Sequence, residues 1–595
     1  MTFDLRCLPN AIRTECRASM ILPETNASTA GSKSGFDLLD ALPPLVLCVF
    51  PLAVYCVLAW FSGFAQRDNL NPDGIVYLRN AYYLSQGRFF DSVSAYWSPL
   101  LSWCVAPLMA CGVDGPHASR LVLAVWGALL VAGSMVFASL RSGTYFPWNL
   151  VVSILIALAA AHWASSFITP DLLQGALLLW YFALTAGKDI LRSRRAQSLA
   201  GALGGLAYLS KAYAFPFFLT HYSLSLLLHH LFGGRHDTTT RHDTTTRQTF
   251  RAWTVGVLFF SMVALPWVLV LSWKTGHLTI STAASLNHFI VGPQKTDAKF
   301  DVIHRAQRPL DGRLTVWESP ERLEFDDWSP VASSAFFHHQ LKHGKENLER
   351  IVRAIAGFGR FSIVPWFLLL AIGVRSIAIG RNVAGSFPVL WIWMTVFVYA
   401  GGFLPLAFEP RYIEPVLWPL CSFLVFDVLV EARALLRSFG LSRSVAPPLF
   451  LLGCVCALSL ASPHVDALHT SLQSSKSQSC PFREGGQKLA ASGCSGPLAV
   501  SGGLWHDGLF VAYYASLPCL GEIEPLSVDR VEAELVQCGA RSFLVASSWR
   551  LFSDFRHRTN WREIYSARRG EDTLHLFVAP DVATGVHRVH PVRQR

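Results

Sequence analysis

The amino-acid sequence predicts an α-helical, polytopic membrane protein that carries a small α/β domain at its C-terminal end. Of its 595 residues, 52% are hydrophobic and only 15% are charged, whereas soluble domains average about 25% charged residues. The mean hydropathy is +0.35. About eleven apolar segments approach the ~20 residues needed to cross a bilayer. They lie near 42–61, 118–139, 147–163, 170–187, 197–212, 214–232, 253–272, 354–374, 385–406, 412–430 and 445–462.

The charges between these segments predict the orientation of the chain. Lysine and arginine gather in the tail 1–40 and in alternate loops after it, which is typical of cytoplasmic loops. We therefore expect a cytoplasmic tail, a transmembrane domain over 41–462, and outer loops 62–117 and 273–352 on the periplasmic side of a cell inner membrane. The first apolar run lacks a convincing cleavage site, which favours an anchor over a signal peptide. Since this topology accounts for the net charge of +10, we expect no nucleic-acid partner.

Residues 463–595 are expected to form a periplasmic α/β domain. The runs GPLAVSGG, CLGEIEP, RSFLVAS and TLHLFVA have the composition of strands, and DGLFVAYYASL and SVDRVEAELVQCG that of intervening helices. The Gly-rich run SGGLWHDG has neither spacing of a nucleotide-binding motif. Cys480, Cys494, Cys519 and Cys538 could form two disulfides in an oxidising compartment, with three possible pairings.

The stretch 66–103 in the first outer loop is the most informative part of the sequence. Asn71 can cap a helix, Pro72 fits its first turn and Gly87 fits its end. The helix would be amphipathic and suited to a membrane surface, with Asp73 in its first turn. On local grounds, Asp73 could simply complement the helix dipole, worth up to ~1 kcal/mol.

Other ionisable residues change this interpretation, because the predicted topology brings them to the same side of the membrane. Such residues at the edge of lipid commonly line a cavity or a pathway, although single ones also snorkel to head groups or cap helices. The set is Asp68, Asp73, Asp91, Asp171, Lys211, Arg360, Arg411 and Glu414.

A carboxylate beside cations at a membrane suits one transfer reaction in particular. A lipid-phosphate leaving group already carries its charge, so the reaction needs one base for the acceptor hydroxyl. It also needs cations that stabilise the departing phosphate. The pattern therefore favours transfer of a sugar from a polyprenyl phosphate sugar, and it also suits a transporter of an anionic substrate.

Several passages resemble the GT-C superfamily of integral-membrane glycosyltransferases. They are PDGIVYLRNAYYLSQGRFF…SPLLSW, LPWVLVLSWKTG, WESPERLEFDDWSP and RYIEPVLWP. The resemblance is strongest to bacterial relatives of the dolichyl-phosphate-mannose protein mannosyltransferases (glycosyltransferase family 39) and to the aminoarabinose transferases. It implies a GT-C type fold and a base in the first outer loop, at Asp73 or alternatively Asp68. In this chain Gly74 stands where many members have a second acid, and Ser98-Pro99 where many have lysine before proline.

The sequence thus predicts an inverting glycosyltransferase that uses a polyprenyl-phosphate-linked sugar. The acceptor would be a hydroxyl of a protein, of lipid A or of an envelope glycan. Lys211 and Arg411 are assigned to the phosphate by position and charge, and Asp171, Glu414 and Arg360 to the substrate cavity. The alternatives are a transporter or flippase of an anionic lipid-linked substrate and a non-catalytic envelope protein.

No cofactor is certain from the sequence. His338, His339 and His343 could reach a metal, and some members of the superfamily use a divalent ion, but no ligand signature stands out, and a solvated loop is the simpler interpretation. The duplicated RHDTTT at 235–247 is interpreted as a tolerant linker.

Overall fold

A computed structural model describes residues 44–140, 146–187, 189–232, 246–294, 299, 302, 304–360, 363–379, 387–440, 442–474, 480–523 and 527–580. The predicted cytoplasmic tail 1–40 and most of the repeat at 235–247 lie outside these residues.

Each of the eleven predicted apolar segments coincides with or overlaps a helix. These helices are α3 (Pro44–Ala65), α7 (Gly115–Leu140), α8 (Phe146–Ser166), α9 (Asp171–Ala186), α10 (Arg194–Ser210), α11 (Ala214–Phe232), α12 (Thr246–Thr275), α16 (Ile363–Ile379), α17 (Phe387–Gly401), α18 (Glu414–Ser438) and α19 (Ser442–Ser474). Among the described residues, five helices are long and apolar enough to cross a membrane, namely α7, α8, α12, α18 and α19. Shorter apolar helices, including α9, α16 and α17, complete the bundle.

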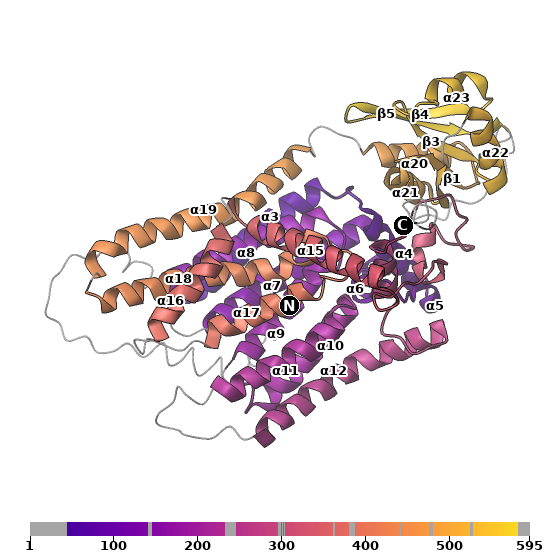
Figure 1. The fold of residues 1–595 in the computed structure, drawn as a ribbon. Coiled ribbons are helices and arrows are strands. Elements are labelled where there is room, and N and C mark those ends of the chain that lie inside the picture. The colour runs from indigo at the N-terminus through magenta and orange to yellow at the C-terminus, as the bar shows by residue number, and fades with distance from the viewer. Residues whose placement is uncertain are drawn as a thin grey trace. The chain divides into compact units, whose positions relative to one another are not determined.

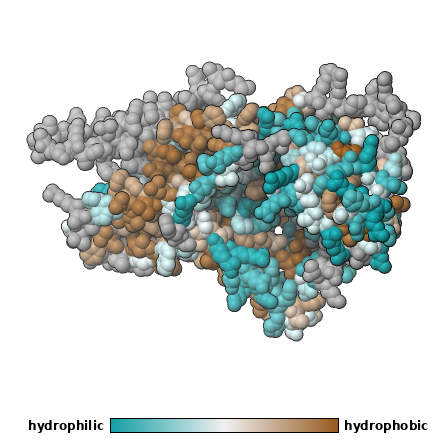
Figure 2. Space-filling model, turned by 90° about the horizontal axis from the view of Figure 1, so that it is seen from above, coloured by the Kyte–Doolittle hydropathy of each residue, from teal (hydrophilic) through white to brown (hydrophobic). Residues whose placement is uncertain are grey.

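The surface of the molecule separates by hydropathy. In Figure 2, hydrophobic side chains gather towards the left, over the helical bundle, and the right side is mostly hydrophilic. Figure 1 shows the C-terminal strands in yellow at that right-hand end of the bundle. The protein is a multi-pass membrane protein, and its polar end carries the outer loops and the sheet.

The first outer loop forms three helices: α4 (Pro72–Ser85), α5 (Phe89–Ser92) and α6 (Leu100–Ala110). The predicted start at Asn71 and Pro72 is correct, and the helix ends before Gly87, whose φ is +74°. The predicted surface location of α4 is wrong, because Ile75, Tyr77 and Leu78 are buried within the protein. The reason is that α6 packs against α4, and the second outer loop covers it as well.

The second outer loop is more structured than the sequence suggested. It contains α13 (Ala283–Ile290), the 3-10 turns η2 (Val316–Glu318) and η3 (Pro320–Arg322), and the long helix α15 (Ser334–Ala356). The indole nitrogen of Trp97 donates to the Trp317 carbonyl oxygen at 2.6 Å. This bond ties the second outer loop to the first.

The C-terminal region contains a five-stranded sheet between two pairs of helices. Its strand order is β2-β1-β3-β5-β4, in which β1 is parallel to β2 and β3, and β5 is antiparallel to β3 and β4. The elements are α20 (Pro481–Ala491), β1 (Leu498–Ser501), α21 (Trp505–Ala515), β2 (Cys519–Ile523), α22 (Val528–Cys538), β3 (Ser542–Ala546), α23 (Phe552–Arg558), β4 (Arg562–Arg569) and β5 (Asp572–Val578). All four predicted strand runs are strands, and the sequence missed β4.

A segment of the second outer loop extends this sheet. The amides of Ala306 and Gln307 donate to the carbonyl oxygens of Glu522 and Leu520 at 2.9 and 2.8 Å. In return, the amide of Glu522 donates to the His304 carbonyl oxygen at 2.8 Å. Residues 304–307 therefore cover the outer edge of β2, which would otherwise be an unpaired sheet edge.

The possible disulfides are absent from the described structure. Cys480, Cys494, Cys519 and Cys538 are all free thiols. Cys519 is buried in β2, whereas Cys538 ends α22 on the other face of the sheet. Neither of the two possible bridges therefore forms among the described residues.

Candidate functional site

Asp73 and Arg411 form an ion pair at the outer end of the helical bundle. Asp73 stands in the first turn of α4, and Arg411 stands in the turn η5 (Pro410–Tyr412) that precedes α18. Arg411 Nη2 donates to Asp73 Oδ2 at 2.6 Å, and its Nε donates to Glu409 Oε2 at 2.5 Å. A single guanidinium therefore joins two carboxylates, and the Asp73 side chain keeps 31% of its surface exposed.

A second ion pair joins Asp171 and Lys211. Asp171 is the first residue of α9, and Lys211 directly follows α10. The Lys211 ammonium contacts Asp171 Oδ1, and the Thr169 hydroxyl donates to Asp171 Oδ2 at 2.7 Å. The Asp171 side chain is only 7% exposed, so it is less accessible than Asp73.

Tyr412 connects the two ion pairs. The Lys211 ammonium lies 4.1 Å from the centre of its ring, and the Arg411 guanidinium carbon lies 5.4 Å from it. Burial alone would lower the pKa of Arg411. The carboxylates of Asp73, Asp171 and Glu409 outweigh this effect and raise that pKa above its usual value. The two acids and the two cations therefore belong to one electrostatic cluster.

Aromatic side chains form a wall beside Asp73. The ring centres of Tyr77 and Trp97 are 5.4 Å apart, and those of Tyr96 and Trp97 are 4.7 Å apart. Burial, reinforced by the charge of Asp73, raises the pKa of Tyr77 and of Tyr96 above the ordinary value. Both phenols are therefore neutral at physiological pH, and they place a polar, uncharged surface next to the acid.

The structure separates Asp68 from this cluster. Arg483 in α20 donates to Asp68 Oδ1 at 2.7 Å, and the Tyr514 hydroxyl donates to the Asp68 carbonyl oxygen at 3.3 Å. Asp68 thus attaches the C-terminal region to the loop before α4. Of the two candidates for the base, only Asp73 faces the cations predicted to bind phosphate.

The remaining predicted site residues lie at different distances from the cluster. Glu414 begins α18 and is within electrostatic range of Asp171. Arg360 pairs with Asp466 on an exposed surface, and Asp91 pairs with Arg88 at 2.7 Å. The structure therefore does not bring Arg360 and Asp91 into contact with the two ion pairs.

Glu318 is a buried carboxylate that the sequence analysis did not single out as a site residue. The Tyr83 hydroxyl donates to it at 2.5 Å and the Leu314 amide at 2.6 Å. Arg313 and Arg79 lie 3.4 and 3.5 Å from its oxygens. Since Tyr83 and Arg79 belong to α4, this network fixes the second outer loop to the helix that carries Asp73.

The three histidines considered for a metal are engaged elsewhere. His338, His339 and His343 lie along α15 and face the carbonyl oxygens of Ser334, Val291 and Leu406. Within the described part of the chain, no three His, Cys, Asp or Glu side chains converge in a way that could hold a metal ion. These three histidines therefore do not fit a metal site.

Comparison with known proteins identifies the fold. No protein-family model matches the chain, and no curated protein matches it in sequence. The crystal structure of ArnT from Cupriavidus metallidurans in the apo state aligns with a TM-score of 0.51 and 14% identity, over 90% of this chain and 99% of that chain. ArnT from the same organism, bound to undecaprenyl phosphate, also aligns with a TM-score of 0.51, at 13% identity and the same coverage. The chain has the GT-C fold.

A close contact within this chain explains the glycine at position 74. A Cβ atom there would lie 2.7 Å from Asn71 Oδ1 and 2.8 Å from Ile168 Cβ. Asn71 does not cap α4 through its side chain, because its Oδ1 accepts the Ile168 amide at 2.8 Å. The start of α4 is thus packed against the segment before α9, and this contact leaves no room for a second acid.

The C-terminal region of this GT-C fold approaches the site through the run SGGLWHDG. The ring of Trp505 lies 5.7 Å from the rings of both Trp317 and His304. Burial and His304 lower the pKa of His506, and the carboxylate of Asp73 acts in the opposite direction. His506 is therefore within electrostatic range of Asp73.

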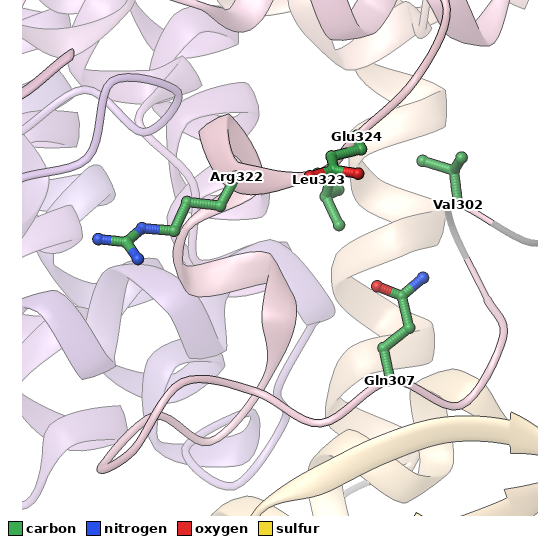
Figure 3. A pocket seen from close by; sticks show the side chains of 5 residues that line it. All are labelled: Val302, Gln307, Arg322, Leu323 and Glu324. Atoms are coloured by element: carbon green, nitrogen blue, oxygen red, sulfur yellow. The ribbon is translucent and has the colours of Figure 1, made fainter. Parts of the chain in front are cut away.

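A hollow of about 400 Å³ lies in the second outer loop. It is lined by Val302, Gln307, Arg322, Leu323 and Glu324. Figure 3 shows the Gln307 amide pointing up towards Leu323 and Glu324, and the Arg322 side chain extending away from that space. None of the residues of the two ion pairs lines this hollow.

Proposed function

We propose that this protein is a glycosyltransferase that transfers a sugar from a polyprenyl-phosphate-linked donor to an acceptor hydroxyl. The observation that carries the proposal is the Asp73–Arg411 pair beside the Asp171–Lys211 pair. It supplies one accessible carboxylate and two cations around a single aromatic ring. The GT-C fold and the apolar surface of the bundle support a donor that is anchored in the membrane.

The two cations are the proposed partners of the donor phosphate. A phosphate that binds Arg411 and Lys211 would replace Asp73 and Asp171 as their anionic partners. Arg411 offers a planar fork of donors, and Lys211 offers a compact point charge. Binding of the donor would thus release Asp73 from its ion pair at the moment when a base is needed.

Asp73 is the proposed general base of an inverting step. Its carboxylate takes the proton of the acceptor hydroxyl while that oxygen bonds to the anomeric carbon of the sugar. The bond between the anomeric carbon and the phosphate oxygen breaks, and its electron pair leaves with the phosphate. Arg411 and Lys211 stabilise the charge on this leaving group.

The donor class draws support from the structural relative. ArnT from Cupriavidus metallidurans has been solved with undecaprenyl phosphate, and we extend that class of lipid to this chain. We place the protein in the cell inner membrane, with a cytoplasmic N-terminus and with the site and the C-terminal region in the periplasm. The lysines and arginines of alternate loops support this orientation.

The acceptor is proposed to approach Asp73 from the side of the C-terminal region. Trp505 packs against Trp317, which accepts a hydrogen bond from Trp97 of the aromatic wall, and His506 is within electrostatic range of Asp73. A hydroxyl of a protein, of lipid A or of an envelope glycan would fit this arrangement. In this view, the α/β region of residues 463–595 contributes to acceptor recognition.

The test is sugar release from a labelled panel of polyprenyl phosphate sugars, with candidate acceptors present. Wild type is compared with Asp73→Asn and with the matched control Asp68→Asn, each checked for a monodisperse folded state. Loss of a general base costs about 100-fold or more in turnover, and we expect this loss for Asp73→Asn alone. If turnover collapses in Asp68→Asn instead, Asp68 is the base and the protein is still a glycosyltransferase. Saturable lipid binding without any turnover would favour a transporter or a partner-binding protein.

A further inference from the structure

Four large apolar side chains form a stripe along α15. Phe337, Leu341, Leu348 and Val352 follow one another at helical spacing and are 50%, 57%, 52% and 52% exposed. A continuous apolar stripe on a helix that lies outside the bundle needs a partner, because exposed apolar patches mark sites of contact with protein or membrane.

The adjacent face of α15 is held by contacts with the rest of the protein. Asn347 is fully buried, and its amide nitrogen lies within hydrogen-bond distance of the carbonyl oxygens of Phe403, Leu404 and Leu406, at 3.1, 3.1 and 2.6 Å. Ile351 is buried on the same side of the helix. These contacts fix the rotation of α15 about its axis, so the stripe points away from the protein.

The neighbouring features indicate what covers the stripe. α15 leads almost directly into α16, where Trp366 and Leu369 are 69% and 59% exposed as part of the lipid-facing surface. Lys342 and Lys345 are exposed beside the stripe, and Arg353, also exposed, pairs with Glu349 at 3.2 Å. Long basic side chains can lay their stems on an apolar surface and extend their charges to lipid phosphates.

We infer that α15 is an interfacial helix that inserts its stripe into the bilayer surface, with Lys342 and Lys345 at anionic head groups. Its apolar stripe, polar opposite border and flanking basic residues match the requirements of a helix that lies in the plane of the interface. The same helix holds residues 403–406, which lead to Glu409 and Arg411. The lipid contact therefore sits on the element that supports the cationic side of the site.

Site-specific photo-crosslinking of the full chain in vesicles tests this inference. A benzophenone side chain replaces Leu348 in one variant, Leu341 in a second, and Glu346 on the charged face of the same helix as the matched control. Each purified protein is reconstituted in phosphatidylcholine vesicles, with and without phosphatidylglycerol, irradiated, and analysed by mass spectrometry. The measurement requires no enzymatic turnover, so its result is independent of whether the proposed function is correct.

We expect lipid adducts at positions 348 and 341, and only background at 346. We also expect the yield at 348 to rise with phosphatidylglycerol, and Lys342→Gln combined with Lys345→Gln to remove that rise. Three outcomes would overturn the membrane contact. They are equal lipid adducts at 346 and 348, no adduct at 348 and 341, and an adduct with protein at 348. A yield that is indifferent to phosphatidylglycerol would overturn the role assigned to the basic residues.

Discussion

The guanidinium of Arg411 lies 2.6 Å from the carboxylate of Asp73, although 338 positions separate the two residues in the chain. Arg411 pairs with Asp73 and also with Glu409. In the proposed reaction, Asp73 acts as a base after the lipid phosphate has replaced it as the partner of the guanidinium.

Arg411→Lys should weaken donor use. Lysine keeps the charge, but it cannot reach Asp73 and Glu409 with two separate nitrogens as the guanidinium does. Loss of one charge-assisted hydrogen bond, worth about 1.5–3 kcal/mol, predicts a fall in kcat/KM for the donor of roughly 10-fold to 100-fold. Steady-state kinetics with the labelled donor measure this fall in kcat/KM.

Arg360→Lys is the matched control for that variant, because the Arg360 guanidinium pairs with Asp466 on an exposed surface. Its kinetics should equal those of wild type. Equal losses in both variants would contradict the assignment of Arg411 to the phosphate.

Gly74→Ala should displace the start of α4. The added Cβ would lie 2.8 Å from Ile168 Cβ, and overpacking of this kind typically costs about 1–3 kcal/mol. We expect a lower melting temperature and reduced turnover, because Asp73 moves with the helix. Gly63→Ala in α3, where a Cβ meets nothing within 4 Å, should leave both quantities unchanged. Full activity of Gly74→Ala would show that the close contact is not needed.

Glu318→Gln should strongly destabilise the outer loops. Arg79 and Arg313 are largely buried beside this carboxylate, and removal of one partner from a buried ion pair costs about 3–5 kcal/mol. Thermal unfolding and limited proteolysis of residues 304–333 measure the effect. Glu324→Gln, on an exposed part of the same loop, is the control. A protease-resistant Glu318→Gln protein would contradict this role.

Asp507 should make the C-terminal region less stable as the pH rises from about 4 to 6. Burial raises the pKa of Asp507 to about 6, despite the opposing effect of Arg569. Between the pKa of the unfolded chain and this value, the folded state binds more protons than the unfolded state. Stability therefore falls with increasing pH across that interval.

Asp507→Asn should remove this dependence and raise the melting temperature at pH 7. Melting curves of the full chain at several pH values between 4 and 7 provide the comparison with wild type. Parallel pH profiles for the two proteins would refute the assignment to Asp507.

The local features of this fold could be predicted from the sequence. The helices of the bundle are runs of apolar residues, and α4 begins at an Asn-Pro pair, so both signals lie within a few residues. The strand β4 escaped notice because it is an edge strand with charged residues such as Arg562, Glu563 and Arg568. The burial of α4 could not be read from its own pattern, since its cover comes from residues more than 200 positions later, such as Glu318.

The site was predictable only in part. Asp73, Asp171, Lys211 and Arg411 were selected because they lie at the outer ends of predicted helices, and the structure joins them in two ion pairs. Their pairing depends on contacts between distant segments, which residue type alone does not encode. Arg360 met the same criterion and pairs elsewhere. The aromatic wall and His506 depend on tertiary structure in the same way.

The strand-like segment 304–307 has a consequence for how the protein is made. The C-terminal sheet is a joint product of two stretches of chain that are synthesised about two hundred residues apart. An excised C-terminal fragment would expose an unpaired β2 edge. Gly521 in this strand has a φ of +119°, and a Cβ atom there would lie only 2.7 Å from the His304 carbonyl oxygen. The glycine thus allows the close approach of residues 304–307. Because residues 304–307 are synthesised before β2, the partner for this strand edge already exists when β2 is made.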